Sequence, residues 1–232
     1  MRLRLVHGFT QTIRAWEMVE ARLPRDWDVQ PVEIPDGLDF VATAATLGLR
    51  GGAGTWVGYS MGGRLCLRLA LDRPELVERL VLLSASPGIV APADREARLT
   101  VDEGRVRDLE RDGVEKFLEH WLSQRMFETL PREATMIDER QRRNTVHGLA
   151  HQLRALGQAA HEPMWDRLSE LEMPVLVVSG QWDRAYTEIA EQVGAAIGAN
   201  AHVVTVAKAG HALHLERPDE VAQLLVSWLE TA

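Results

Sequence analysis

Apolar residues along most of the chain alternate between short dense runs and positions at helical spacing, which predicts strands alternating with helices. The short runs are the predicted strands, at 2–6, 29–34, 55–58, 79–85, 174–180 and 202–207. The helically spaced segments are the predicted helices, at 13–23, 41–49, 61–72, 186–197 and 218–231. Alternation of this kind favours a parallel sheet with helices on both faces, an α/β fold.

Residues 88–165 interrupt this alternation. They are rich in charged residues and helix formers, as in REARLTVDEGRVRDLERDGVEKFLEHW, and they contain no convincing strand. We therefore expect a helical cap inserted at about 88–165 into a single domain that spans residues 1–232. For most individual residues here, the simpler expectation is a solvated charged face.

Gly58-Tyr59-Ser60-Met61-Gly62 matches the pattern G-x-S-x-G between a predicted strand and a predicted helix. In that context the pattern indicates a sharp turn that presents a nucleophilic serine at a helix N-terminus. Backbone N–H groups at such a terminus favour a developing negative charge. Ser60 is the candidate nucleophile, and a small residue in a tight turn is the alternative.

A nucleophilic serine needs a base and an acid that orients the base, and in this type of fold they follow in the order Ser, Asp, His. His211 directly follows the last predicted strand, and Asp183 lies three residues after Gly180, where the preceding strand ends. Asp166 precedes that strand and would lie at the wrong end. We therefore predict that Ser60, Asp183 and His211 form a catalytic triad.

The charge that develops on a substrate oxygen requires two hydrogen-bond donors. The position after the nucleophile supplies the backbone N–H of Met61. The loop after the first strand, His7-Gly8-Phe9-Thr10, is expected to supply the backbone N–H of Phe9. A simple tight turn is the alternative for this loop.

Composition narrows the range of partners and compartments. The 232 residues are 46% hydrophobic and 26% charged, which is typical of a globular protein, and no run is long enough to span a membrane. The net charge of −8 argues against a nucleic-acid partner. The single cysteine, Cys66, agrees with a cytoplasmic location. We expect no metal ion and no cofactor, and either a monomer or a small homo-oligomer.

With these residues placed, the chain resembles the α/β-hydrolase superfamily. More narrowly, it is similar to the 2-succinyl-6-hydroxy-2,4-cyclohexadiene-1-carboxylate synthase family of menaquinone biosynthesis. The matching motifs are HGFT, GYSMGGR, R-x-x-x-D followed by W-x5-F, RNTVHGLAHQLRALG, EPMWDRL and GHALHLERP. Residues 157–161 (GQAAH) depart from the G-T-G-x-Q that is frequent in this family.

The resemblance implies a lyase that eliminates pyruvate from a small anionic substrate with several carboxylates. It also implies a set of substrate-binding residues, namely Tyr59, Arg64, Arg98, Trp121 and Arg142. A guanidinium matches a carboxylate with two parallel hydrogen bonds, which supports the arginines independently of the family. For each arginine, a surface salt bridge is the alternative.

Two other functions remain open at this stage. The same triad and donors would serve a hydrolase of small carboxylic esters or of carbon–carbon bonds, because proton abstraction and acyl transfer both place charge on a carbonyl oxygen. A catalytically inactive binding protein is a third possibility, although such a relative would typically have lost a triad residue.

Overall fold

The computed structural model describes residues 1–231, and at the centre of this part lies a six-stranded sheet with the strand order β2-β1-β3-β4-β5-β6. The strands are β1 (Arg2–Val6), β2 (Asp28–Pro31), β3 (Gly54–Tyr59), β4 (Val77–Leu83), β5 (Val175–Gly180) and β6 (Ala201–Val206). All neighbouring strands are parallel, so their carboxyl ends meet at one edge of the sheet. The fold is the predicted α/β class.

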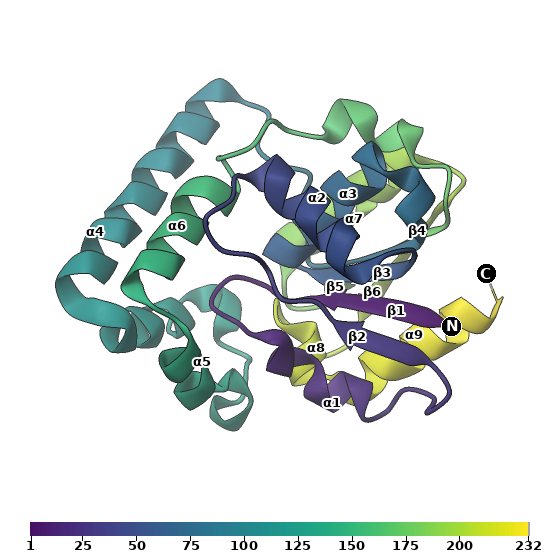
Figure 1. Cartoon of the computed structure of the whole chain (residues 1–232), viewed down its shortest axis with the longest axis horizontal. Coiled ribbons are helices and arrows are strands. Elements are labelled where there is room, and N and C mark those ends of the chain that lie inside the picture. Colours follow the sequence, from purple (N-terminus) through teal and green to yellow (C-terminus); the bar gives the residue numbers. More distant parts are fainter. Residues whose placement is uncertain (232) are drawn as a thin grey trace.

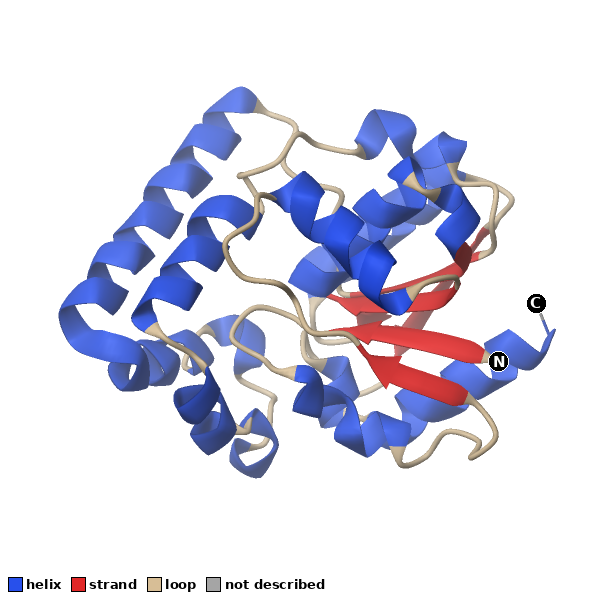
Figure 2. Cartoon of the chain, in the orientation of Figure 1, coloured by secondary structure: helices blue, strands red, loops and turns tan. Residues whose placement is uncertain are grey.

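Helices cover both faces of this sheet, as Figures 1 and 2 show. One face carries α2 (Phe40–Gly51), α3 (Met61–Asp72) and α7 (Arg184–Ile197), and the other carries α1 (Glu17–Glu20), α8 (Leu213–Glu216) and α9 (Pro218–Thr231). Short 3₁₀ helices are η1 (Ile13–Trp16), η2 (Pro74–Leu76) and η5 (Trp165–Glu170).

Strand side chains divide the interior into two clusters because successive residues point to opposite faces. In β4, Leu80 and Leu82 pack with the core beneath α2, α3 and α7, whereas Val81 and Leu83 pack with the core beneath α1, α8 and α9. All four are at most 1% exposed. This explains why the predicted strand at 79–85 is apolar at nearly every position.

The stretch between β4 and β5 forms a group of helices that lies beyond the carboxyl ends of the strands (Figures 1 and 2). This helical segment, residues 92–156, consists of α4 (Pro92–Leu122), η3 (Arg125–Phe127), η4 (Arg132–Thr135), α5 (Ile137–Arg143) and α6 (Val146–Leu156). Gly113 interrupts α4 with φ 79° and ψ 174°, which is a glycine conformation. The segment has its own buried cluster, in which Leu109 and Leu118 pack with Leu149.

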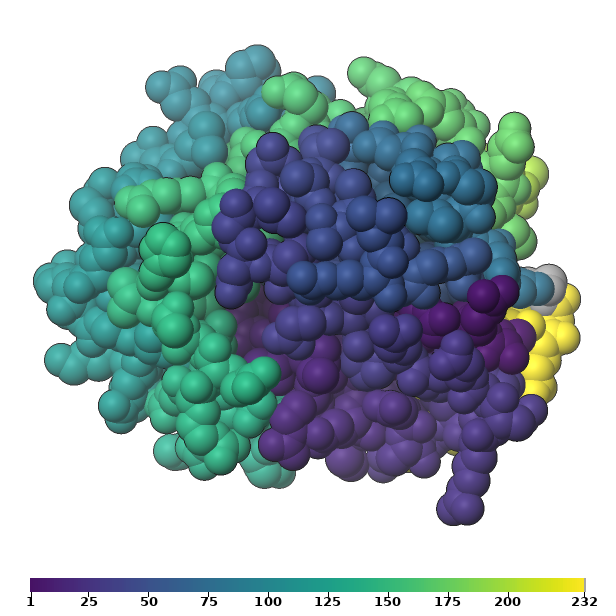
Figure 3. All heavy atoms as spheres, viewed as in Figure 1, coloured from purple at the N-terminus to yellow at the C-terminus, as the bar shows by residue number. Residues whose placement is uncertain are grey.

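The helical segment also contacts the N-terminal loops, and in Figure 3 its teal and green atoms adjoin the purple and dark-blue ones. The side-chain amide of Asn144 donates to the carbonyl of Thr10 at 2.8 Å, and Nε2 of His151 donates to the carbonyl of Leu38 at 2.9 Å. The segment is therefore held over the loops that follow β1 and β2.

Most predicted elements match the structure to within about two residues at each end, and two differ more. The predicted strand at 29–34 ends as β2 at Pro31, although the N–H of Val32 still donates to the carbonyl of Leu5 at 2.9 Å. The neighbouring strand β1 itself ends at Val6, so little partner strand remains beyond this point. The predicted helix at 13–23 is a 3₁₀ turn followed by the single turn α1. Pro24 disfavours a helical conformation at the residue before it, so the helix cannot continue through residue 23.

Candidate active site

Ser60 stands in a strained turn between β3 and α3, with φ 50° and ψ −108°. Its N–H donates to the carbonyl of Leu83 at 2.9 Å, which fixes the turn against the end of β4. A Cβ on Gly62 would lie 2.4 Å from the carbonyl oxygens of Val6 and His7, so only glycine allows α3 to approach β1 this closely. The predicted position of Ser60 at a helix N-terminus is therefore observed.

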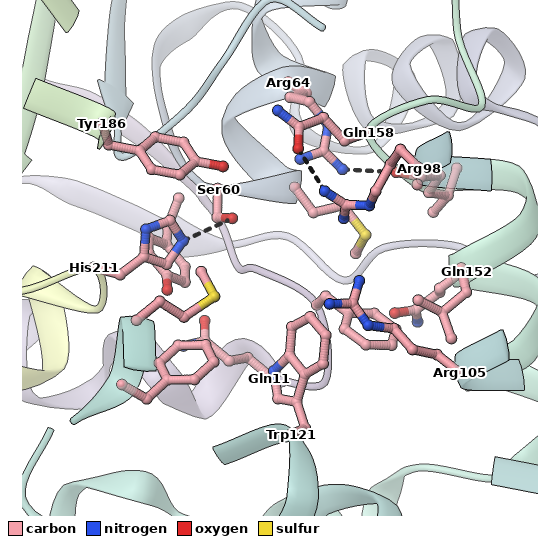
Figure 4. A pocket seen from close by; sticks show the side chains of 18 of the residues that line it. Gln11, Ser60, Arg64, Arg98, Arg105, Trp121, Gln152, Gln158, Tyr186 and His211 are labelled. Atoms are coloured by element: carbon pink, nitrogen blue, oxygen red, sulfur yellow. Dashed lines mark hydrogen bonds between the residues drawn. The ribbon is translucent and has the colours of Figure 1, made fainter. Parts of the chain in front are cut away.

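Ser60, His211 and Asp183 form a continuous hydrogen-bonded chain. Nδ1 of His211 lies 2.6 Å from Oδ2 of Asp183. Nε2 of His211 lies 3.2 Å from Oγ of Ser60, a contact that Figure 4 marks with a dashed line. A carboxylate only accepts hydrogen bonds, so Nδ1 of His211 carries a proton, and Nε2 of the neutral ring is free to accept from the serine hydroxyl. The structure thus brings together the three residues that the sequence placed at separate strand ends.

The two loops that carry Asp183 and His211 come together because the end of β5 lies close to the backbone of the loop after β6. A Cβ on Gly180 would lie 2.1 Å from the carbonyl oxygen of Gly210. The N–H of Trp182 donates to the carbonyl of Ala209 at 2.8 Å, which joins the two loops directly. Glycine at position 180 is therefore required for the contact between the acid and the base.

Aromatic rings enclose His211, whose side chain is only 1% exposed. The ring of Tyr186 lies 4.6 Å from it at 62°, and the ring of Tyr59 lies 5.4 Å away. Burial raises the pKa of both tyrosines, so both remain neutral phenols at neutral pH. Tyr186 points toward Ser60 in Figure 4 and was missed by the sequence reasoning, because one tyrosine in a helix gives no functional signal.

Phe9 and Met61, whose backbone N–H groups are the expected oxyanion donors, both line the cavity beside Ser60. Met61 is the first residue of α3, where a backbone N–H has no partner within the helix. Phe9 lies in a turn that is closed by the backbone N–H of Gln11, which donates to the carbonyl of Gly8 at 3.2 Å.

A cavity of about 110 Å³ opens beside Ser60, between the carboxyl edge of the sheet and the helical segment. Its lining combines aromatic rings, aliphatic side chains and four arginines. The polar and charged side chains among the lining residues are those of Gln11, Tyr59, Ser60, Arg64, Arg98, Arg105, Trp121, Arg140, Gln152, Gln158, Tyr186 and His211. In Figure 4, Arg64, Arg98 and Arg105 lie on one side of Ser60 and His211 on the other.

Arg64 is buried one turn after Ser60 on α3, with 6% of its surface exposed. One terminal nitrogen donates to the carbonyl of Leu156 at 2.8 Å, while Nε has no partner. Burial lowers the pKa of Arg64 to about 10, which leaves it charged at neutral pH. Within residues 1–231 no carboxylate forms an ion pair or hydrogen bond with this guanidinium, so a buried positive charge faces the cavity without a directly bound counter-ion.

Arg98 and Arg105 share one carboxylate on α4. Nε of Arg98 donates to Asp102, and a terminal nitrogen of Arg105 donates to the same carboxylate at 2.7 Å. A second nitrogen of Arg98 donates to Gln158 at 2.8 Å, so the segment that departs from the family pattern helps to hold this arginine. Arg105, seven residues after Arg98 on the same helix face, was missed, although that spacing was visible in the sequence.

The structure does not place Arg142 in the cavity. Its side chain is 68% exposed and pairs with Glu139 on the surface of α5. Arg140 is 3% exposed and lines the cavity instead, donating through Nε to the carbonyl of Thr135 at 2.7 Å and through a terminal nitrogen to the hydroxyl of Thr10. Residues two apart on a helix point in nearly opposite directions. The prediction that Arg142 lines the cavity is therefore wrong, and Arg140 takes that position.

Trp121 lines the cavity as expected, and the guanidinium of Arg105 lies 5.2 Å from the centre of its ring. The indole nitrogen of Trp121 and the side-chain oxygen of Gln152 are buried without a hydrogen-bond partner. Buried polar atoms usually have a partner, so Arg64, Trp121 and Gln152 together offer groups that a ligand with polar atoms would satisfy.

Two structural findings bear on the expected partners. Among the described residues no group of three or more His, Cys, Asp or Glu side chains is arranged to hold a metal ion. None of the helices in residues 1–231 is both long enough and apolar enough to cross a membrane.

Comparisons with known proteins agree with this geometry. The model of the alpha/beta hydrolase family matches residues 5–224. A protein of Bacillus subtilis (strain 168), provisionally named a 2-succinyl-6-hydroxy-2,4-cyclohexadiene-1-carboxylate synthase, is 30% identical over 97% of this chain and 88% of its own. The solved structure of MenH from S. aureus superposes with a TM-score of 0.92 and 26% identity, over 99% of this chain and 93% of that one.

An esterase is also similar to the chain. The pimeloyl-[acyl-carrier protein] methyl ester esterase of Xanthomonas campestris pv. campestris (strain B100) is 27% identical over 85% of this chain and 77% of its own. The family model covers nearly the whole sequence, and the parallel sheet, the serine turn and the order of Ser60, Asp183 and His211 agree with it. The chain therefore belongs to the alpha/beta hydrolase family.

Proposed function

We propose that this protein is a lyase that eliminates pyruvate from a carboxylate-rich precursor to give 2-succinyl-6-hydroxy-2,4-cyclohexadiene-1-carboxylate. The observation that carries the proposal is the charge of the cavity. Four arginines line it, and two of them, Arg64 and Arg140, are buried without a carboxylate partner among residues 1–231.

Uncompensated buried charge is costly, and an anionic ligand would remove that cost. Arg64 and Arg140 both keep a pKa of about 10 despite burial, so both carry their charge at neutral pH. A substrate with several carboxylates matches such a cavity better than a neutral ester does. The names of the Bacillus subtilis relative and of the S. aureus structure support the same substrate class.

The hydrogen-bonded chain suits removal of a proton from the substrate ring. His211, oriented by Asp183, accepts the proton of Ser60 Oγ, and the serine oxygen then takes a proton from ring carbon. The backbone N–H groups of Phe9 and Met61 would stabilise the resulting enolate-like charge. The electron pair moves into the ring and the carbon–oxygen bond to the enolpyruvyl group breaks. The departing enolate becomes pyruvate by taking up a proton at carbon, and the protonated His211 returns its proton to balance this uptake.

Ester hydrolysis is the second candidate function. The Ser60–His211 distance of 3.2 Å fits acyl transfer equally well, and one of the relatives is named as a methyl ester esterase. In that reaction Ser60 would attack the ester carbonyl and form an acyl enzyme. The arginines would then select esters that also carry a carboxylate.

Release of pyruvate separates the two functions. The purified protein is given the menaquinone-pathway precursor and, separately, neutral p-nitrophenyl esters. We expect pyruvate release with kcat/KM of about 10⁴ M⁻¹s⁻¹ or more and slow ester turnover. Fast ester turnover without pyruvate would replace the lyase with the esterase, and Ser60→Ala is the control for turnover at this site.

A further inference from the structure

The carboxylate of Glu216 binds the backbone on both sides of His211. The N–H of Gly210 donates to Oε2 of Glu216 at 2.8 Å, and the N–H of Ala212 donates to Oε1 at 3.1 Å. Hydrogen bonds to a carboxylate are stronger than those between neutral groups. Glu216 therefore holds the backbone of the loop that carries His211. Both hydrogen bonds are to backbone N–H groups and neither is to the imidazole ring.

The same carboxylate also binds the helical segment. The hydroxyl of Thr129, which lies between η3 and η4, donates to Oε2 of Glu216 at 2.8 Å. A Cβ on Gly210 would lie 2.2 Å from the oxygen of Thr129, so the two chains are in close contact at this point. Glu216 is thus a link between the histidine loop and the segment that supplies Arg98, Arg105 and Trp121 to the cavity.

This arrangement matters because a proton-transfer residue tolerates little displacement. His211 must keep Nε2 within reach of Ser60 and Nδ1 within reach of Asp183, and positions are needed to within about 0.5 Å. Asp183 orients the imidazole ring, but β6 ends at Val206, so the sheet ladder does not hold the backbone of the loop at His211. The two backbone N–H groups bound to the carboxylate of Glu216 hold that backbone on both sides of the histidine.

We infer that Glu216 is a positioning residue, which sets the alignment of His211 and, through Thr129, makes that alignment depend on the placement of the helical segment. The inference rests on the proposed role of Ser60 and His211 but holds for a lyase and an esterase alike. It assigns no chemical step to Glu216.

Covalent labelling of Ser60 by an organophosphonate, followed by mass spectrometry, tests the alignment without any natural substrate. In Glu216→Ala the labelling rate should fall about 10- to 100-fold, since a displacement of about 1 Å has an effect of this size. Glu216→Gln, which keeps one acceptor oxygen, should give an intermediate rate. Glu220→Ala, which removes an exposed carboxylate four residues away, should label like the wild type.

Thr129 supplies the matched pair for the link itself. Thr129→Val removes the hydroxyl at nearly constant shape and should slow labelling about threefold to tenfold, whereas Thr129→Ser should restore the rate to within about twofold. If Glu216→Ala does not fold, the comparison of Thr129→Val with Thr129→Ser still tests the inference. Melting temperatures of all variants are measured alongside.

Each outcome has a distinct meaning. Slow labelling in folded Glu216 and Thr129→Val variants, with rescue by Thr129→Ser, supports the inference. Wild-type labelling rates in these variants would overturn it while leaving the triad intact. An unlabelled wild-type protein would instead overturn the proposed role of Ser60, and the inference with it.

Discussion

The carboxylate of Asp102 accepts hydrogen bonds from Nε of Arg98 at 2.9 and 3.0 Å, one helical turn away on α4. The side chain of Asp102 is 5% exposed, so this contact is screened little by water. Because Nε is engaged with Asp102, the arginine is held in one direction, toward Gln158 and the cavity.

Asp102→Asn should therefore disturb binding through Arg98 and Arg105. We expect a loss of stability of about 1–3 kcal/mol, since two guanidinium groups lose a buried charged partner. On the anionic substrate kcat/KM should fall about tenfold, with little change on a neutral ester. Asp108→Asn is the control, because Asp108 pairs with Arg111 at the surface of the same helix. Equal effects of the two substitutions would contradict a special role for Asp102.

Removal of a triad residue should abolish turnover. Ser60→Ala and His211→Ala should each lower kcat by several orders of magnitude, and the double variant should be scarcely worse, because these residues act as a unit. Steady-state kinetics on the true substrate, with circular dichroism to verify folding, makes the measurement. If Ser60→Ala kept more than about a tenth of the activity, Ser60 would not be the reacting residue.

The cavity arginines should determine the substrate class. Arg64→Ala and Arg98→Ala should each lower kcat/KM on the anionic substrate about 10- to 1,000-fold, because each leaves a carboxylate unpaired. Lysine should rescue only in part, since it restores the charge without the planar fork. The measurement compares anionic and neutral substrates in each variant.

Arg142→Ala serves as the control for these substitutions, because its side chain is exposed and paired with Glu139. It should leave kcat/KM within about twofold. Equal losses of kcat/KM on the anionic and neutral substrates in Arg64→Ala and Arg98→Ala, at unchanged melting temperature, would mean that these arginines support the structure of the site. Esterase activity would then be the better interpretation.

Much of the site could be predicted from the sequence because its catalytic residues lie at the ends of strands. Ser60, Asp183 and His211 each lie just after a run of apolar residues, and parallel strands bring such positions to one edge. The class of fold was predictable for the same reason. Which residues of the helical segment face the cavity was not, as Arg140 and Arg142 illustrate. The phase of a short helix depends on its packing, and α5 has little apolar pattern to indicate it.

The protein should lose stability as the pH falls below neutrality, in part through His161. Burial and the nearby arginines, Arg64 first among them, lower the pKa of His161 from its ordinary 6.5 to about 4. Because the folded pKa lies below the unfolded one, the unfolded chain binds the proton first. The stabilisation is complete above about pH 6.5 and is lost as the pH falls toward about 4.

Between pH 7 and pH 5 the loss attributable to His161 should be roughly 2 kcal/mol. His161→Phe keeps a ring that can stack on Phe40, 3.9 Å away in the wild type, but cannot take up a proton. Urea unfolding at the two pH values should therefore show a smaller loss in His161→Phe than in the wild type. His7 and His214, the other two buried histidines with a lowered pKa, are present in both proteins. The loss of stability that they cause at low pH should therefore be the same in His161→Phe and in the wild type.

The interruption of α4 at Gly113 separates two stretches of helix, so the helical repeat does not run unbroken from one to the other. An extra residue inside a continuous helix turns everything beyond it by about 100°. At Gly113 the helical repeat is already broken, and a Cβ there would meet nothing within 4 Å, so φ and not space is what favours glycine. Arg98 and Arg105 precede this point and Trp121 follows it. We therefore expect a change of chain length to be tolerated better at residue 113 than inside either stretch of helix.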